Sequence, residues 1–364
     1  MSGLARIVLG WGAFVALTLS GDLLAAPVPA PLLIAALAGI VLVIVIAAFG
    51  VVTQAESLAH RLGDPYGTLI LTLSIVLIEV VLISAILLGP GAHPTIARDS
   101  VMAVSMIIVN LVVGAALVVG GRRHRDGLTV NRTGTRIYLV LLVLLCAVAF
   151  ALPKLIGVDG SYTAAQAVVV AVGTLGLYAF FLYRQTGPDA DAFREPGAAA
   201  EPKHPPAGRV WAEHRREILT RIALLVVTAI PIVLLSHDLA SLLDDGLARL
   251  GAPEPLAGLL IAAIVFLPES LTAIRAGRAG ETTRVSNLCH GALVSTVGLT
   301  IPAVLVIGLL TGKTVVLAES GTHLILLAVS LALSFATFGA RRIRAWHGAL
   351  HLLVFAVYAL VLFV

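Results

Sequence analysis

The sequence predicts an all-α polytopic membrane protein, and three observations support this fold class. Of the 364 residues, 59% are hydrophobic and only 12% are charged, with a mean hydropathy of +1.04. A soluble chain cannot bury so much apolar surface. The apolar residues form continuous runs and do not alternate, which excludes a transmembrane β-barrel. The basic residues gather in alternate connections. This composition also excludes a disordered chain and a nucleic-acid-binding protein.

About eleven segments are apolar and long enough to cross a bilayer, which takes about 20 helical residues. They are residues 4–20, 30–52, 66–89, 100–120, 137–152, 163–183, 218–243, 255–274, 285–310, 321–339 and 346–363. An alternative for the first segment is a cleaved signal peptide, since Leu24-Ala25-Ala26 resembles a cleavage region. The apolar stretch is long and Arg6 is its only basic flanking residue, which favours a membrane helix.

The basic residues indicate which side of the membrane each connection faces, because short cytoplasmic loops collect Lys and Arg. With the N-terminus inside, alternating spans give the cytoplasmic segments 20 of the 24 basic residues. The outside segments hold only Arg98, Lys154, Arg249 and Lys313. We therefore expect a multi-pass protein of the bacterial inner membrane, with a cytoplasmic N-terminus and an external C-terminus.

The domain organisation follows from one long connection and a short repeated motif. Residues 185–217 are rich in Pro, Gly, Ala and charge, which predicts a flexible cytoplasmic linker. The motif Arg-Leu-Gly-x-Pro occurs at 61–65 and again at 249–253, each time just before an apolar helix but on opposite predicted sides. We therefore expect an extra N-terminal helix in 1–29 and two inverted five-helix repeats, in 30–184 and 218–364.

Each predicted repeat carries one glutamate within an apolar span. Glu79 lies near the middle of its span, and Glu269 follows Pro268 closer to the cytoplasmic end of its own. A carboxylate inside the membrane costs roughly 3 kcal/mol on insertion scales, so it usually faces water, a partner or a bound ion. Pro268 removes a backbone donor, and the resulting helix break can offer carbonyl oxygens to a cation.

Glu79 and Glu269 are therefore the candidate binding residues for a cation and for protons. Carboxylates that share a buried site hold protons more tightly than they do in water. One state of such a site binds protons and another binds a metal ion. Oxygen ligands suit Ca²⁺, Na⁺ or K⁺ better than copper or zinc. The pattern predicts cation/proton exchange without a cofactor.

Several other polar residues are candidates for a surrounding shell. These are Thr72, Asn110, Asn287, His290 and Ser295. A helix–helix hydrogen bond explains the two amides equally well, and packing is the preferred explanation for the hydroxyls. His290 is either a proton relay or a core histidine. Glu56, at the end of the second span, is a candidate for the cytoplasmic mouth of the pathway, and a solvated helix end explains it equally well.

Other site types find little support in the sequence. Cys146 and Cys289 lie within apolar runs and have no disulfide or zinc spacing. His347 and His351 have the spacing of a metal pair but lack an acidic third ligand nearby in sequence, so we interpret them as interfacial or packing residues. No Gly-rich phosphate loop or nucleophile elbow occurs, which argues against nucleotide binding and catalysis.

Three stretches of the sequence resemble the ChaA-type calcium/proton and sodium(potassium)/proton antiporters of the cation exchanger (CaCA) superfamily. They are Gly63-Asp64-Pro65-Tyr66 through to Glu79-Val80, Arg98-Asp99-Ser100, and Leu299-Thr300-Ile301-Pro302 through to Lys313. The resemblance implies eleven spans, a five-plus-five inverted repeat, and alternating access driven by the proton gradient. It also implies one essential glutamate in each repeat, Glu79 and Glu269. The wider superfamily often carries Gly-Asn before each acid, where this chain has Ile75-Val76 and Val265-Phe266.

The leading hypothesis is a proton-coupled antiporter that exports calcium, with sodium or potassium as other possible cargoes. The alternatives are a passive cation channel and an intramembrane enzyme that uses the two carboxylates as acid and base. The expected partners are the lipid bilayer, inorganic cations and protons, and neither nucleic acid nor a nucleotide.

Overall fold

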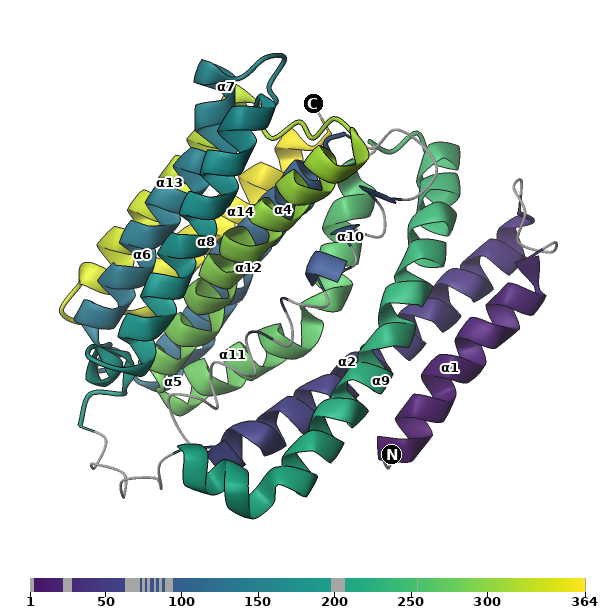
Figure 1. The fold of residues 1–364 in the computed structure, drawn as a ribbon. Coiled ribbons are helices and arrows are strands. Elements are labelled where there is room, and N and C mark those ends of the chain that lie inside the picture. The colour runs from purple at the N-terminus through teal and green to yellow at the C-terminus, as the bar shows by residue number, and fades with distance from the viewer. Residues whose placement is uncertain are drawn as a thin grey trace. The chain divides into compact units, whose positions relative to one another are not determined.

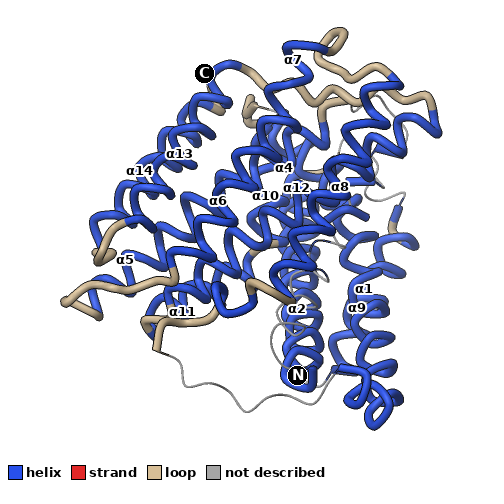
Figure 2. The backbone as a smooth tube through the Cα atoms, turned by 60° about the vertical axis from the view of Figure 1, so that its left-hand side comes forward, coloured by secondary structure: helices blue, strands red, loops and turns tan. Residues whose placement is uncertain are grey.

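Helices dominate the structure, a computed structural model that describes residues 3–21, 28–62, 73, 76, 79–81, 83–84, 87–88, 94–197, 207–253 and 255–363 (Figure 2). Among these residues, seven helices are long and apolar enough to cross a membrane, and one bent pair of helices is either an eighth, broken span or a re-entrant loop. Helices α1 (Gly3–Leu19) and α14 (Ala345–Val361) are shorter and apolar. The predicted fold class is confirmed. The predicted span 66–89 falls largely outside the described residues.

The chain divides into two compact units, each built from distant parts of the sequence. Unit 1 comprises Met1–Leu82 and Ala200–Pro268, and unit 2 comprises Ile83–Ala199 and Glu269–Val364. Each unit therefore takes helices from both sides of the long connection.

Unit 1 is held together by the pairing of α2 (Ala30–Leu62) with α9 (Ala207–Arg249), which run side by side (Figure 1). Their buried faces carry aliphatic residues such as Ile44, Leu58 and Leu235. Helix α1 packs against both, and its Trp11 indole donates a hydrogen bond of 3.1 Å to the Val227 carbonyl. Helix α10 (Pro255–Val265) completes the unit.

Unit 2 is a bundle that contains α12 (Thr282–Thr311), a long helix most of whose residues are buried (Figure 1). It packs on α4 (Ile96–Met106), α5 (Val113–Arg123), α6 (Arg132–Cys146) and α8 (Ala164–Thr186). Helix α13 (Gly321–Gly339) packs on α4, α6 and α14, and α14 also packs on α5. Helix α11 (Leu267–Ala279) leads into α12 through a two-residue turn. In this turn Gly280 has a φ of +86°, a conformation that favours glycine.

Two π-helical segments interrupt the spans of unit 2. Segment η2 (Ile107–Val112) joins α4 to α5, and η3 (Ala147–Ala151) joins α6 to the short helix α7 (Leu152–Ile156). A π-helical turn inserts one extra residue into a helix and is common at functional sites. Asn110, one of the predicted site residues, lies in η2.

Small residues allow the helices of unit 2 to approach closely, as is usual in membrane bundles. A Cβ atom on Gly348 of α14 would lie only 2.5 Å from the Gly114 carbonyl oxygen of α5. On α5, Gly120 faces Gly277 of α11 in the same way. These contacts fix α5 against both α11 and α14.

The connection after α8 contains a folded segment, which we call the strap and define as Asp189–Glu195. It includes the 3-10 helix η4 (Ala190–Phe193) and packs on α6, α8 and α12 within unit 2. The Phe193 side chain is 9% exposed, and its ring lies 5.1 Å from Tyr138 and 6.1 Å from Phe181, measured between centroids. Part of the predicted flexible linker is therefore docked on the bundle.

Candidate functional site

Glu79 lies on a helical stretch of unit 1 and is buried, with 4% of its surface exposed. Val76, one turn earlier, is also buried, whereas Leu73 and Val81 are exposed. The carboxylate therefore points to the protein-facing side of its helix. A buried position inside the protein, away from lipid, is the setting in which intramembrane acids are functional.

Glu269 lies in the first turn of α11, at a break in the helix. Helix α10 ends at Val265 and α11 begins at Leu267, with a bend of 57° between them. The sequence predicted a break beside Pro268, and the structure contains one. A helix break leaves the last carbonyls of one segment and the first N–H groups of the next without helical partners.

The Glu269 carboxylate has one oxygen sealed from solvent. Its Oε2 atom is inaccessible and has no hydrogen-bond partner among the described residues. A buried carboxylate oxygen without a donor is an energetic cost that a proton or a cation removes. The chemistry of this position therefore suits reversible binding of either.

Asn110 is fully buried and joins two helices. Its Nδ2 atom donates a hydrogen bond of 2.8 Å to Ser330 Oγ on α13. Its Oδ1 atom has no hydrogen-bond partner among the described residues. Asn110 thus makes a helix–helix contact, as one of its two interpretations predicted, and keeps one acceptor open.

His290 is also fully buried and belongs to a chain of polar contacts across two helices. Its Nδ1 atom lies 3.0 Å from Ser286 Oγ, which lies 2.9 Å from Thr135 Oγ1 on α6. The ring packs edge to face on Phe338, with centroids 5.0 Å apart. The Nε2 atom of His351 lies 3.3 Å from Thr337 Oγ1.

Among the described residues, no group of three or more His, Cys, Asp or Glu side chains could hold a metal ion.

Asn287 is engaged with the strap. Its Nδ2 atom donates a hydrogen bond of 2.7 Å to the Phe193 carbonyl. The Asn131 Nδ2 atom, at the start of α6, donates to the carbonyls of Asp191 at 3.1 Å and Arg194 at 3.4 Å. Sequence reasoning considered a shell role for Asn287 but did not foresee this contact.

Glu195 connects the strap to the N-terminus of α12. Its carboxylate accepts a hydrogen bond of 2.8 Å from the Arg284 backbone N–H. Partial burial raises the pKa of Glu195 above its ordinary value, although its hydrogen bonds with Arg284 and Thr283 act in the opposite direction. An acid at a helix N-terminus also interacts favourably with the helix dipole.

The other predicted residues have separate surroundings. Ser295 donates to the Gly291 carbonyl at 2.9 Å and accepts from the Tyr178 hydroxyl at 2.9 Å. Thr72 lies outside the described residues, and Glu56 lies on α2 with its side chain outside them. Asn110, Asn287, His290 and Ser295 thus bond to partners other than Glu269.

A buried acid that sequence reasoning missed lies at the other end of α12. Glu319 is 3% exposed, and its Oε2 atom lies 3.0 Å from His323 Nδ1 and accepts a bond of 2.8 Å from the Ser320 N–H. Arg98 Nε lies 3.7 Å from its Oε1 atom. The sequence signal that could have indicated this contact is the four-residue spacing of Glu319 and His323 across the start of α13.

Comparisons with known proteins agree with this architecture. The family described as sodium/calcium exchanger protein matches residues 32–187 and 220–364. The sodium-potassium/proton antiporter ChaA of Escherichia coli K12 is 32% identical over 352 residues, covering 96% of this chain and 94% of its own.

Solved structures show the same fold at lower sequence identity. YfkE superposes with a TM-score of 0.66 and 16% identity, over 100% of this chain and 99% of its own. An H⁺/Ca²⁺ exchanger CAX superposes with a TM-score of 0.68 and 16% identity, over 98% of this chain and 87% of its own. The sequence-based resemblance to cation antiporters is confirmed, and these relatives are transporters rather than enzymes.

Proposed function

Because the chain belongs to the sodium/calcium exchanger protein family, we propose that it is a secondary active antiporter that exports a cation in exchange for protons. Glu79 and Glu269 bind the cation and the protons in turn. The observation that carries this assignment is the sealed Oε2 atom of Glu269 at a helix break. The burial of Glu79 within the protein supports it.

The exchange follows from the chemistry of a carboxylate. When Glu79 and Glu269 are ionised, their oxygens attract a hard cation, and backbone carbonyls at the α10–α11 break are suitable further ligands. When protonated, they lose that charge and release the cation. Obligatory exchange results if the protein changes its access only with one of the two cargoes bound.

Calcium is the leading cargo, with sodium or potassium as the alternative. YfkE and CAX are described as Ca²⁺/H⁺ antiporters, whereas ChaA is described as a sodium-potassium/proton antiporter. The apolar pairs Ile75-Val76 and Val265-Phe266 supply no side-chain oxygen beside the acids. Fewer oxygen ligands favour a less strongly coordinated cation, so monovalent ions belong in any assay.

The proposed membrane orientation has the N-terminus in the cytoplasm and the C-terminus outside the inner membrane. In unit 2, the ends of α5, α11 and α13 and the starts of α6, α12 and α14 carry most of the arginines. The positive-inside rule assigns that end to the cytoplasm.

Everted membrane vesicles with a preset proton gradient test the proposal. Addition of the cargo should release protons from the vesicle interior, seen as recovery of a quenched pH-sensitive dye, with calcium, sodium, potassium and magnesium tried at several pH values. A passive channel would instead respond to voltage without obligatory proton movement. Dye recovery that is absent for all four cations, or that needs no proton gradient, contradicts antiport.

A further inference from the structure

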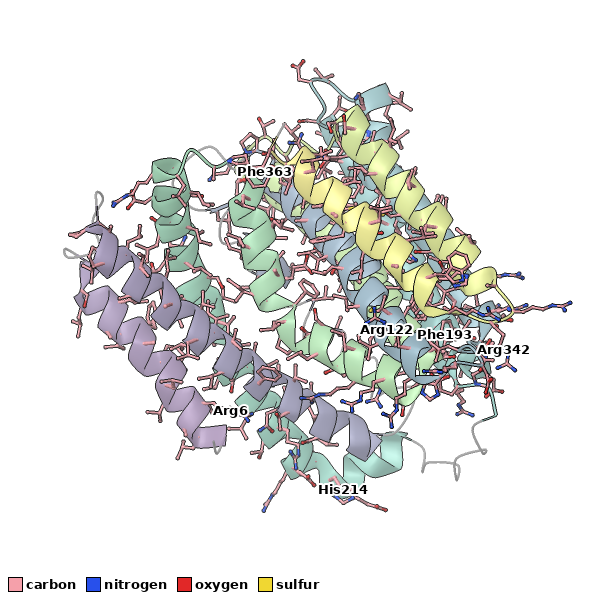
Figure 3. All side chains as sticks on the ribbon, turned by 180° about the vertical axis from the view of Figure 1, so that it is seen from behind. Arg6, Arg122, Phe193, His214, Arg342 and Phe363 are labelled. Carbon is pink, nitrogen blue, oxygen red and sulfur yellow. The ribbon has the colours of Figure 1, made fainter. Side chains whose placement is uncertain are left out.

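One end of unit 2 carries a dense set of exposed arginines, which we call the arginine rim. It consists of Arg122, Arg123, Arg125, Arg136, Arg275, Arg278, Arg341, Arg342 and Arg344. All nine side chains are exposed. Arg122 and Arg342, from different connections, lie at the same end of the unit as Phe193 (Figure 3). Three segments that are far apart in the sequence thus meet at one surface.

Backbone contacts hold these segments together rigidly. Leu128 and Ile343 exchange two backbone hydrogen bonds, of 2.8 Å and 2.9 Å, which join the α5–α6 loop to the α13–α14 loop. Arg132 supports this junction by donating a hydrogen bond of 2.9 Å to the Ala340 carbonyl. His124 Nε2 lies 3.2 Å from the Arg278 carbonyl, which adds the end of α11. The rim is therefore a preformed surface.

Among the residues that the structure describes, the rim arginines lack counterions, whereas several arginines elsewhere have them. Arg184, Arg194 and Arg284 each form an ion pair with a nearby carboxylate, at 2.7 Å to 3.0 Å. Among the described residues, no carboxylate pairs with any of the nine rim arginines. Only one acidic residue, Asp126, occurs in the two paired loops. The positive-inside rule explains why basic residues occur at this end, but it does not explain their clustering without acids.

The surface next to the rim indicates which kind of anion fits. Trp346, two residues after Arg344, is 56% exposed and stacks on His347, as expected for an aromatic residue at a membrane interface. Further along α14, Leu350 and Leu353 are exposed, and Val140 and Val143 are exposed on α6. An anion that bears acyl chains can contact these apolar faces while its headgroup meets the arginines. A soluble phosphate or an acidic protein would use only the rim.

We propose that the arginine rim is a binding site for anionic phospholipids, whose headgroup phosphates lie on the arginines and whose acyl chains lie along α6 and α14. Guanidinium groups bind phosphate in a bidentate manner and are favoured wherever phosphate is recognised. Clusters of basic residues at the end of membrane helices bind anionic headgroups. The site needs only a membrane setting and does not depend on the proposed antiport.

Native mass spectrometry of the purified full-length protein tests this proposal. The probes are phosphatidylglycerol and phosphatidylcholine with identical acyl chains. The test variant is Arg341→Gln/Arg342→Gln/Arg344→Gln. The matched control is Arg194→Gln/Arg284→Gln, which removes two arginines that already have carboxylate partners. A third variant, Arg341→Lys/Arg342→Lys/Arg344→Lys, keeps the charge.

The wild-type protein and the control should bind phosphatidylglycerol in preference to phosphatidylcholine. Each arginine near the headgroups is worth roughly fivefold in affinity, so the triple glutamine variant should lose about a hundredfold. The triple lysine variant should bind phosphatidylglycerol better than the glutamine variant and less well than the wild type, since it keeps the point charges but loses the bidentate geometry. It also reports on binding if the glutamine variant does not fold.

Several results would overturn the proposal. One is equal binding of both lipids by the wild type. A second is a glutamine variant that still prefers phosphatidylglycerol as strongly as the wild type does. A third is a control variant that loses this preference to the same extent as the glutamine variant. Displacement of phosphatidylglycerol by inorganic phosphate alone would assign the rim to a free anion. Transport is not measured in this experiment, so its outcome is separable from that of the antiport assay.

Discussion

The side-chain amide of Asn287 donates a hydrogen bond of 2.7 Å to the backbone carbonyl of Phe193. This bond connects α12, the central helix of unit 2, to the strap between α8 and α9. A residue that the sequence suggested for an ion site thus holds the connection between α8 and α9 in place. Asn131 also bonds to the strap, and Glu195 within the strap bonds to the start of α12, so three polar side chains help to hold it in place.

Replacing Asn287 with alanine should loosen the strap. The lost hydrogen bond is worth about 1 kcal/mol, so opening should become roughly fivefold more frequent. Hydrogen–deuterium exchange of the Ala192 amide, which bonds to the Asp189 carbonyl within the strap, measures this. Thr311→Val is the control, because it removes a hydroxyl bond at the opposite end of α12. Equal exchange in Asn287→Ala and the wild type would contradict the anchoring role.

The docking of the strap should depend on pH through Glu195. Its pKa is raised by burial, so the docked strap binds a proton more tightly than the free strap does. This carboxyl therefore stabilises docking most at pH values below the ordinary pKa of glutamate. That stabilisation is lost as the pH rises through the raised pKa of the docked state. Hydrogen–deuterium exchange at several pH values, corrected for intrinsic rates, should show more opening at high pH. In Glu195→Gln this dependence should disappear, and a persistent pH slope would assign it to another group.

Gly348→Ala should destabilise unit 2 because the added methyl group meets backbone. Its Cβ atom would lie 2.5 Å from the Gly114 carbonyl oxygen and 2.7 Å from the Val118 nitrogen. Overpacking of this kind costs about 1–3 kcal/mol. Thermal unfolding in detergent measures the effect. The matched control is Gly173→Ala on α8, where no atom lies within 4 Å of the new Cβ and the stability should be unchanged or slightly higher. Similar melting curves for the two variants would refute the close contact.

Glu79→Gln and Glu269→Gln should each abolish cation/proton exchange while the protein remains folded. Glutamine keeps the volume of the side chain but can neither take up a proton nor carry a charge. Dye recovery in everted vesicles measures exchange, and the unfolding temperature reports on the fold. Glu281→Gln, which alters a partly exposed acid paired with Arg284, should leave exchange intact. Wild-type rates in either test variant would remove that glutamate from the proposed site.

Apolar runs and charge asymmetry were sufficient to predict the fold class. The helix break near Pro268 could also be predicted, because proline removes a local backbone hydrogen bond. The π-helical turns have no comparable local signal and result from packing between helices. The strap has the composition of a linker, and its position depends on contacts of Phe193 with Tyr138 and Phe181, which come from other parts of the chain.

The candidate site was predicted to a smaller extent. Intramembrane acids are conspicuous in any apolar run, so Glu79 and Glu269 could be identified from the sequence. The partners of Asn110, Asn287 and His290 could not, because each partner lies on a different element or depends on a buried hydroxyl. Glu319 escaped notice since it lies in a loop, where an acid is unremarkable until its burial is known.

The single extra residue in η2 has a geometric effect along the whole span. One residue turns an α-helix by about 100°, so the insertion rotates everything that follows it relative to everything before. Without it, the face of α4 that contacts the bundle would continue into a side of α5 other than the one that carries Gly114 and Gly120. After deletion of one residue from this segment, the contacts of α4 and those of α5 could therefore not both be kept.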